Sequence, residues 1–175
     1  MHGRIFEHQY RFLWTRCKEP DEDDWGKLKR VLKYLCSTMH MKLCLSVDNR
    51  HTLTWWLDAS YAVHWYSRSH TGMVMSLGLR AAMSGSWRQK LNIGSSTELE
   101  LVGIDDALKH IMWGFYFIQA QLYEVTKNIL IQDNKSTILM AKNGQLSCSK
   151  RTKHIKNIYF MIKDKIGKGE VIIQY

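Results

Sequence analysis

The sequence predicts an α/β fold in which helices cover a mixed β-sheet. Strand-like segments separated by glycines come first, and strands that alternate with amphipathic helices follow. Hairpins give antiparallel pairs, whereas strands joined through helices pair in parallel, so one sheet should contain both kinds of pairing. Hydrophobic residues make up 45% of the 175 residues, as in a globular chain with a core. This pattern fixes the expected architecture before any single residue is considered.

The first expected element is a helix from about Asp21 to Leu35. Pro20 precedes four consecutive acids, Asp21 to Asp24, and acids in a first turn suit the positive end of the helix dipole. Apolar residues then recur at helical spacing, at Leu28, Val31, Leu32 and Leu35. We interpret the acidic cluster as helix capping and not as a metal site.

Strand signals follow the first helix. Residues 42–47 alternate between apolar and other side chains, and residues 51–60 (HTLTWWLDAS) are rich in Thr and Trp, which favour extended structure. The second strand is expected to end at Asp58. Glycines then punctuate two further segments, which predicts an antiparallel pair joined near Gly78.

The longest expected helix runs from about Ser96 to Tyr123. Two capping boxes are compatible with its start, Ser95 with Glu98 or Thr97 with Glu100. The remaining elements are expected to be a strand at 129–132, helices at 136–142 and 150–166, and a strand at 169–175.

Three acids occupy positions where chemistry is common. Asp58 and Asp133 end predicted strands, and sites in open α/β sheets gather at the carboxyl ends of strands. Glu98 lies in the first turn of the long helix. Clustered carboxylates are typical ligands of Mg²⁺, and two such ions about 3.5–4 Å apart hydrolyse phosphodiesters. The same residues also fit plain turn and capping roles, and Glu100 competes with Glu98.

Several motifs resemble, in order, the ribonuclease H region of copia-type retrotransposon Pol polyproteins. They are LDASYAVH, RSHTGMVMSLG, RQKLNIGSSTELELVGIDDAL, ILIQDNKSTILMAKNG and SKRTKHIKNIYFMIKDKIGKGEV. An earlier stretch, RCKEPDEDDWGKLKRVLKYLCST, resembles the segment that links the reverse transcriptase to that region. The resemblance divides the chain into a helical linker or reverse transcriptase tail, 1–40, and a ribonuclease H-like domain, 41–175.

The resemblance implies a ribonuclease H-like fold with a five-stranded mixed sheet flanked by helices. It also implies a hydrolase that cleaves the RNA strand of RNA–DNA hybrids with two Mg²⁺ or Mn²⁺ ions. The family's catalytic and metal-binding acids map to Asp58, Glu98 and Asp133, which chooses Glu98 over Glu100. A fourth family acid follows the last strand; no residue here matches it, because the sequence stops at Tyr175. We therefore expect a domain that is incomplete at its C-terminus.

Charge and motif together indicate a nucleic-acid partner. The net charge is +9 and the pI about 9.4, which favours a polyanion. A basic segment near the last helix is predicted to contact phosphates, through Lys150, Arg151, Lys153, His154 and Lys156. The implied partners are an RNA–DNA hybrid and the reverse transcriptase region of the same polyprotein.

Neither a membrane nor an export route is indicated. No apolar run approaches the ~20 residues that span a bilayer, and the first residues lack the pattern of a secretory signal. The cysteines are widely spaced, without zinc or redox motifs, at Cys17, Cys36, Cys44 and Cys148. We expect buried thiols and an intracellular, cytoplasmic location, with a virus-like particle or the nucleus as further sites.

Two alternatives stay open beside the ribonuclease. The first is a catalytically inactive, truncated remnant that keeps the fold and binds nucleic acid, because the fourth acid has no match. The second is another nuclease of the same fold, such as a resolvase-like enzyme. The reverse-transcriptase-like segment disfavours this second alternative.

Overall fold

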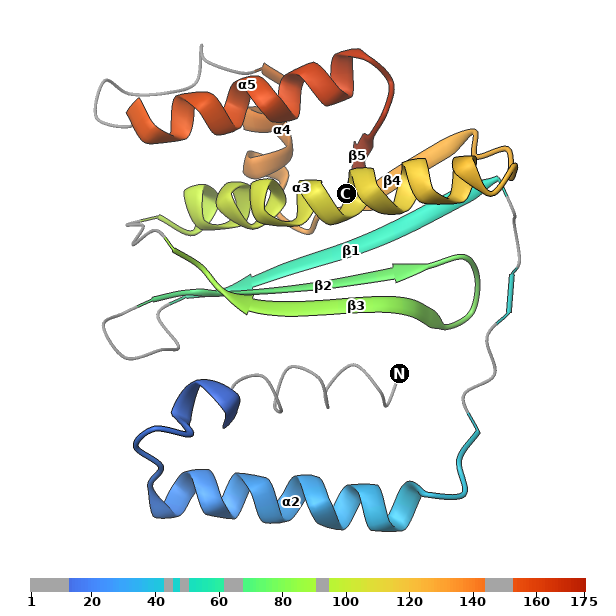
Figure 1. The fold of residues 1–175 in the computed structure, drawn as a ribbon. Coiled ribbons are helices and arrows are strands. Elements are labelled where there is room, and N and C mark those ends of the chain that lie inside the picture. Colours follow the sequence, from blue (N-terminus) through green and yellow to red (C-terminus); the bar gives the residue numbers. More distant parts are fainter. Residues whose placement is uncertain (1–12, 43–45, 48–50, 62–67, 91–94, 144–152) are drawn as a thin grey trace.

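The computed structural model describes residues 13–42, 46–47, 51–61, 68–90, 95–143 and 153–175 (Figure 1). Most of the strands and helices lie within a few residues of their predicted positions. In chain order they are α2 (Glu22–Thr38), β1 (Thr52–Ser60), β2 (His70–Ser76), β3 (Ala81–Arg88), α3 (Ser96–Ala120), β4 (Lys127–Ile131), α4 (Lys135–Asn143), α5 (Lys153–Gly167) and β5 (Ile172–Gln174). The predicted strand at 42–47 has its centre outside the described residues.

The strands form one open mixed sheet in the order β3-β2-β1-β4-β5. The β1–β2 and β2–β3 pairs are antiparallel, and the β1–β4 and β4–β5 pairs are parallel. The hairpins thus supply one half of the sheet and the helical crossovers supply the other. This confirms the predicted five-stranded mixed sheet flanked by helices, and the arrangement is consistent with a ribonuclease H-like fold.

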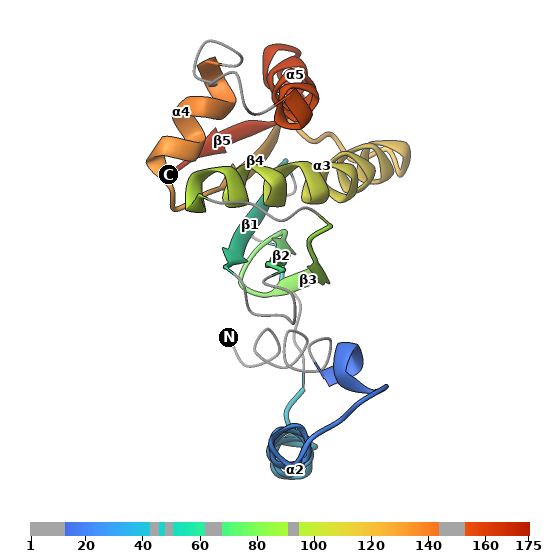
Figure 2. The ribbon, with the colours of Figure 1, turned by 90° about the vertical axis from the view of Figure 1, so that its left-hand side faces the viewer.

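The core lies between the sheet and α3. Alternate residues of β1, namely Leu53, Trp55 and Leu57, are buried, as expected for the inward face of a strand. Close approach of α3 depends on a small residue: a Cβ at Gly114 would lie 2.9 Å from the Trp55 ring. Helices α4 and α5 pack with α3 on the same part of the molecule (Figures 1 and 2).

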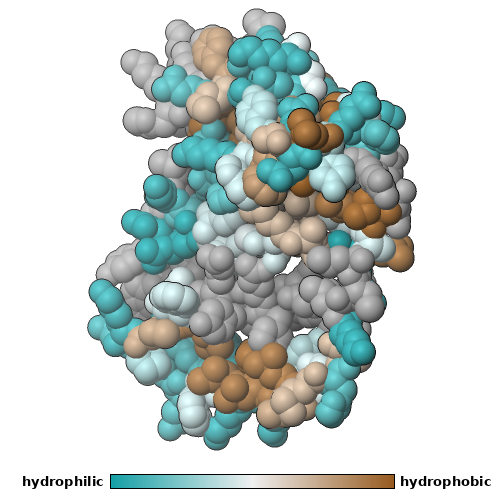
Figure 3. Space-filling view, turned by 45° about the vertical axis from the view of Figure 1, so that its right-hand side comes forward, coloured by the Kyte–Doolittle hydropathy of each residue, from teal (hydrophilic) through white to brown (hydrophobic). Residues whose placement is uncertain are grey.

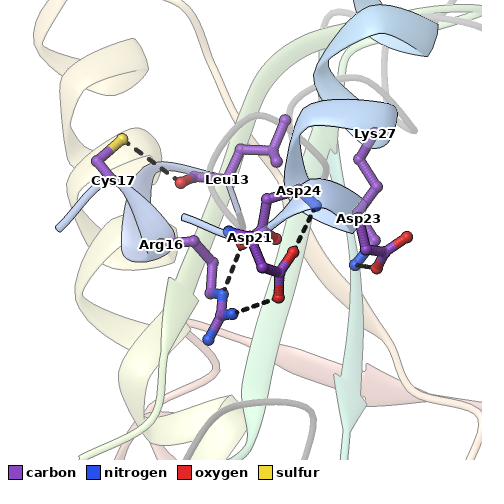
Figure 4. Close-up of polar contacts among 7 residues, drawn as sticks. All are labelled: Leu13, Arg16, Cys17, Asp21, Asp23, Asp24 and Lys27. Atoms are coloured by element: carbon purple, nitrogen blue, oxygen red, sulfur yellow. Dashed lines mark hydrogen bonds and ion pairs between the residues drawn. The ribbon is translucent and has the colours of Figure 1, made fainter. Parts of the chain in front are cut away.

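Helix α2 begins with the capping that its acids predict. Asp21 is the N-cap, and the Asp21 and Asp24 side chains form a reciprocal capping box. Figure 4 shows Arg16 reaching both acids, at 2.9 Å each, while Lys27 pairs with Asp23 at 2.6 Å. The acidic cluster therefore serves the helix end, and the carboxylates of Asp21, Asp23 and Asp24 are paired with cations of the same segment.

Helix α2 lies beyond the β2–β3 hairpin, away from α3, α4 and α5, in both ribbon views (Figures 1 and 2). Hydrophobic side chains gather over α2 in the space-filling view (Figure 3), and Leu32 and Leu35 are exposed. Cys17 and Cys36 are also exposed, so the prediction of buried thiols is wrong for these two residues. They lie in or beside α2, where the core does not reach. The domain division near residue 40 stays a prediction.

The ends of β1 and α3 differ from their predicted positions. β1 continues through Ser60, so Asp58 lies within the strand. Ser95 caps α3 by accepting a hydrogen bond from the Glu98 backbone N–H at 3.2 Å, which decides between the two capping alternatives. The helix stops at Ala120, three residues early, and Leu122 then adopts a left-handed conformation with φ 64°.

Candidate active site

Asp58 and Asp133 are brought together by the register of two parallel strands. β1 pairs with β4 so that Trp56 stands opposite Ile131. Each aspartate lies two residues beyond that pair, Asp58 in β1 and Asp133 just after β4. Both side chains are exposed. The sheet thus places two acids from distant parts of the chain at one edge, as the strand argument predicts.

The two aspartates border an open groove of about 390 Å³ on the sheet. Trp55 and Leu57 face α3, where Gly114 and Gly103 approach them. The alternate residue Asp58 therefore points to the other face of β1. The groove is lined by Trp56, Leu57, Asp58, Gly72, Met73, Val74, Ser84, Gly85, Ser86, Ile131 and Asp133. Glycine and serine have small side chains, so these residues of β2 and β3 fill little of the groove beside the acids.

Glu100 reaches the same edge of the sheet from α3. Its side chain is only 7% exposed. Nε2 of Gln132 donates a hydrogen bond to its Oε2 at 3.1 Å, and the backbone N–H of Ala59 donates another. The carboxyl group therefore sits between the residue after Asp58 and the residue before Asp133.

The surroundings of Glu100 oppose its ionisation. The pKa of this carboxyl group is raised from 4.5 to about 7, mainly by burial, and the hydrogen bond from Gln132 works against that rise. The negative charges of Asp58 and Asp133 contribute a smaller part of the same rise. The charges of Asp58 and Asp133 thus act on a buried carboxyl group that comes from α3, which marks this edge as a candidate site.

The structure places Glu100, and not Glu98, beside the two aspartates. Consecutive helical residues are rotated by about 100°, so residues two apart lie on nearly opposite sides of a helix. Glu98 is half-buried in the first turn, where its backbone N–H bonds to the Ser95 cap. Glu100 is therefore the glutamate of this helix that lies near Asp58 and Asp133, and the catalytic role predicted for Glu98 stays a prediction. The spacing along the helix contains a signal for Glu100 that the sequence reasoning missed, because Glu100 lies on the same side of α3 as the buried Ile104 and Ile111.

The carboxylates of these acids suit a hard divalent cation, but the three groups are not gathered around one point. Carboxylate oxygens are the ligands that Mg²⁺ prefers, and a cation would relieve the repulsion among the three groups. Within the described residues, however, no group of three or more His, Cys, Asp or Glu side chains is close enough together to hold a metal ion. Asp58 and Asp133 are both exposed at this edge.

The structure describes little of the predicted phosphate-binding residues. Lys150 and Arg151 lie outside the described residues, and Lys153, His154 and Lys156 belong to α5 without described side chains. Their role stays a prediction. Further along α5, Lys163 is exposed, whereas Lys165 and Lys168 are paired with Glu170 and Asp164.

Among the helices of the described ranges, none is long and apolar enough to cross a membrane.

Curated proteins resemble most of this chain, whereas no family model matches it. The retrovirus-related Pol polyprotein from transposon TNT 1-94 of Nicotiana tabacum is 28% identical over 157 residues, which cover 89% of this chain and 11% of that protein. The corresponding polyprotein from transposon RE2 of Arabidopsis thaliana is 27% identical over 152 residues, 86% of this chain and 10% of that protein. The chain spans about a tenth of the length of these relatives. The matches confirm the resemblance in the motifs: this chain is related to a segment of retrotransposon Pol polyproteins.

Proposed function

We propose that the chain is a retrotransposon-derived ribonuclease H region that hydrolyses the RNA strand of RNA–DNA hybrids. The observation that carries the proposal is that Asp58 and Asp133 lie at the carboxyl edge of β1 and β4, near enough to the Glu100 carboxyl group for their charges to raise its pKa. The sheet order and the similarity to Pol polyproteins support it. The reverse transcriptase region of the same polyprotein is the partner that this context suggests.

In this proposal the three carboxylates hold the metal ions. Two bound Mg²⁺ or Mn²⁺ ions would supply activation of water and stabilisation of the leaving oxygen. Glu100, buried and hydrogen-bonded, provides the fixed ligand, whereas the exposed Asp58 and Asp133 adjust around it. The groove beside Asp58 leaves the acids open to a backbone phosphate of the substrate.

A second candidate function is nucleic-acid binding without cleavage. It is favoured because, within the described residues, the acids are not close enough together to hold a metal ion. The net charge of +9 supports binding to a polyanion in either case. In this alternative the fold is retained, while the acids do not assemble around metal ions.

Cleavage of a labelled RNA–DNA hybrid in Mg²⁺ or Mn²⁺ tests the proposal. Asp58→Asn, Asp133→Asn and Glu100→Gln should each abolish cleavage, since each removes a metal ligand. Glu98→Gln is the matched control on the same helix and should cleave like the wild type. Equal loss in Glu98→Gln and Glu100→Gln would show that the choice of Glu100 is wrong.

The remaining outcomes separate the candidates. Binding of the hybrid with no cleavage in either metal would support the inactive alternative. Cleavage of branched or double-stranded DNA in preference to the hybrid would favour a resolvase-like activity. Cleavage that persists in Asp58→Asn would come from another site or a contaminant and would contradict the proposal.

A further inference from the structure

Gln132 is a fully buried polar side chain between β4 and α4, and its relative exposure is 0%. Its Nε2 donates to Oε2 of Glu100 at 3.1 Å, and its Oε1 accepts the backbone N–H of Asn134 at 3.1 Å. Its own backbone N–H donates to the carbonyl of Gln174 at 2.9 Å, at the end of the β4–β5 pair. Both ends of the amide and the backbone are therefore engaged.

The orientation of this amide is fixed by its two partners. A reversed amide would turn its carbonyl toward the Glu100 carboxylate and its NH₂ toward the Asn134 N–H, so both contacts would become repulsive. Burying a carboxylate is costly unless donors satisfy it. Gln132 supplies one donor from the end of β4, and Ala59 supplies another from β1.

We propose that Gln132 is a positioning residue that holds the Glu100 carboxylate at the sheet edge beside Asp58 and Asp133, and thereby sets the affinity of the site for a divalent cation. The inference rests on the proposed role of Glu100 as a metal ligand. Groups that orient a ligand from behind typically change metal affinity 10–100-fold when they are removed. Gln132 has this relation to Glu100.

A purely structural role is separable, because a second buried hydrogen bond links the segment after β4 to the first turns of α3 without involving Gln132. Thr137 is fully buried, and its Oγ1 donates to the carbonyl of Thr97 at 3.1 Å, which joins α4 to the first turn of α3. None of the hydrogen bonds recorded for Thr137 involves Glu100. Gln132→Met removes the amide but keeps the side-chain length, and Thr137→Val removes only the helix tie.

The first measurement is Mn²⁺ affinity of the full chain by titration calorimetry, together with the melting temperature in chelator. Gln132→Met should bind Mn²⁺ about 10–100-fold more weakly than the wild type. Thr137→Val should lower the melting temperature and leave the affinity unchanged. Unchanged affinity in Gln132→Met, or equal losses in the two variants, would overturn the inference.

The second measurement needs no metal and follows the Glu100 side chain by NMR of ¹³C-labelled glutamate. A held side chain gives two distinct γ-proton signals in the metal-free wild type, and these should merge in Gln132→Met. Averaged γ protons in the wild type would overturn the inference, even if the variant does not fold. Absence of Mn²⁺ binding in the wild type would instead refute the proposed function, while distinct γ protons would still support positioning by Gln132.

Discussion

Glu100 holds a carboxyl group in surroundings that resist its charge. Burial and the two nearby aspartates raise its pKa, and the hydrogen bonds from Gln132 and Ala59 only partly compensate. A buried carboxyl group with these properties beside two exposed acids is a candidate for function, because a purely structural position would be filled at lower cost by an apolar residue. Glu100 is therefore a stronger candidate for a functional residue than either aspartate.

The raised pKa of Glu100 predicts a pH dependence of stability in the metal-free protein. Below pH 4.5 the carboxyl group is protonated in both states, and between 4.5 and about 7 the folded state keeps a proton that the unfolded chain releases. The free energy of unfolding should therefore fall as pH rises through this window and level off above it, by on the order of 3 kcal/mol.

Urea unfolding in chelator from pH 4 to 8 measures this effect. Glu100→Gln cannot ionise, so it should lack this fall and exceed the wild type in stability at pH 8. Glu98→Gln is the control and should follow the wild-type curve. A wild-type curve parallel to that of Glu100→Gln would show that the Glu100 pKa is not raised.

Two glycines of α3 face β1 in different surroundings, and only one of them is required for the close packing of the helix on the strand. A Cβ at Gly114 would lie 2.9 Å from the buried Trp55 ring, whereas a Cβ at Gly103 would meet its nearest neighbour, Leu57, at 3.4 Å. Alanine favours a helix over glycine by about 1 kcal/mol. The two sites should therefore respond oppositely to the same substitution.

Gly114→Ala should destabilise the protein by about 1–3 kcal/mol, because the Trp55 ring is fully buried and cannot move away. Gly103→Ala should be neutral or stabilising by up to about 1 kcal/mol. Chemical denaturation of both variants at one pH measures the difference. Equal effects at the two positions would contradict the described packing of α3.

The end of α3 allows a stabilising substitution. Leu122 has φ 64° and its side chain is 95% exposed, so the strain of the left-handed conformation is offset by little packing. Leu122→Gly should raise the free energy of unfolding by about 1 kcal/mol. Leu122→Ala keeps the Cβ and should have little effect, so equal gains in both variants would argue against a strained backbone.

At the scale of the whole molecule, charge governs the expected partner. The chain has 25 Lys and Arg residues against 16 Asp and Glu residues, while the candidate site is itself acidic. Binding to a nucleic acid therefore has to come from basic residues outside the groove. The exposed Lys163 of α5 and the exposed Lys33 of α2 lie on separate parts of the molecule and allow this to be tested.

We expect affinity for a short RNA–DNA duplex to fall at least about tenfold between 50 and 200 mM NaCl, which corresponds to about two neutralised phosphates. Lys163→Gln should reduce the slope of log affinity against log salt by about one. Lys33→Gln is the matched control and should leave the slope unchanged. Fluorescence anisotropy measures both, and an affinity independent of salt would contradict binding through basic residues.

Much of this architecture follows from local sequence patterns. The periodicity around Val31 predicts α2, the Asp21 cap predicts its start, and the alternation of strands with helices predicts a mixed sheet. Asp58 and Asp133 were also predictable, since each comes at the end of a strand-like run. These features depend on residues close together in the chain, where spacing alone carries the information.

The choice between Glu98 and Glu100 needed the tertiary structure. Both flank the apolar stripe of α3 in the sequence, and only the docking of α3 on the sheet shows which side meets the carboxyl ends of β1 and β4. Gln132 likewise reads as an ordinary strand residue until its amide is seen against Glu100. The sequence by itself determined most of the elements and singled out Asp58 and Asp133 as candidates, because those depend on local periodicity. Only the tertiary structure decided that Glu100 lies near both aspartates and accepts a hydrogen bond from Gln132, because burial and contact between distant segments arise when the sheet and helices pack together.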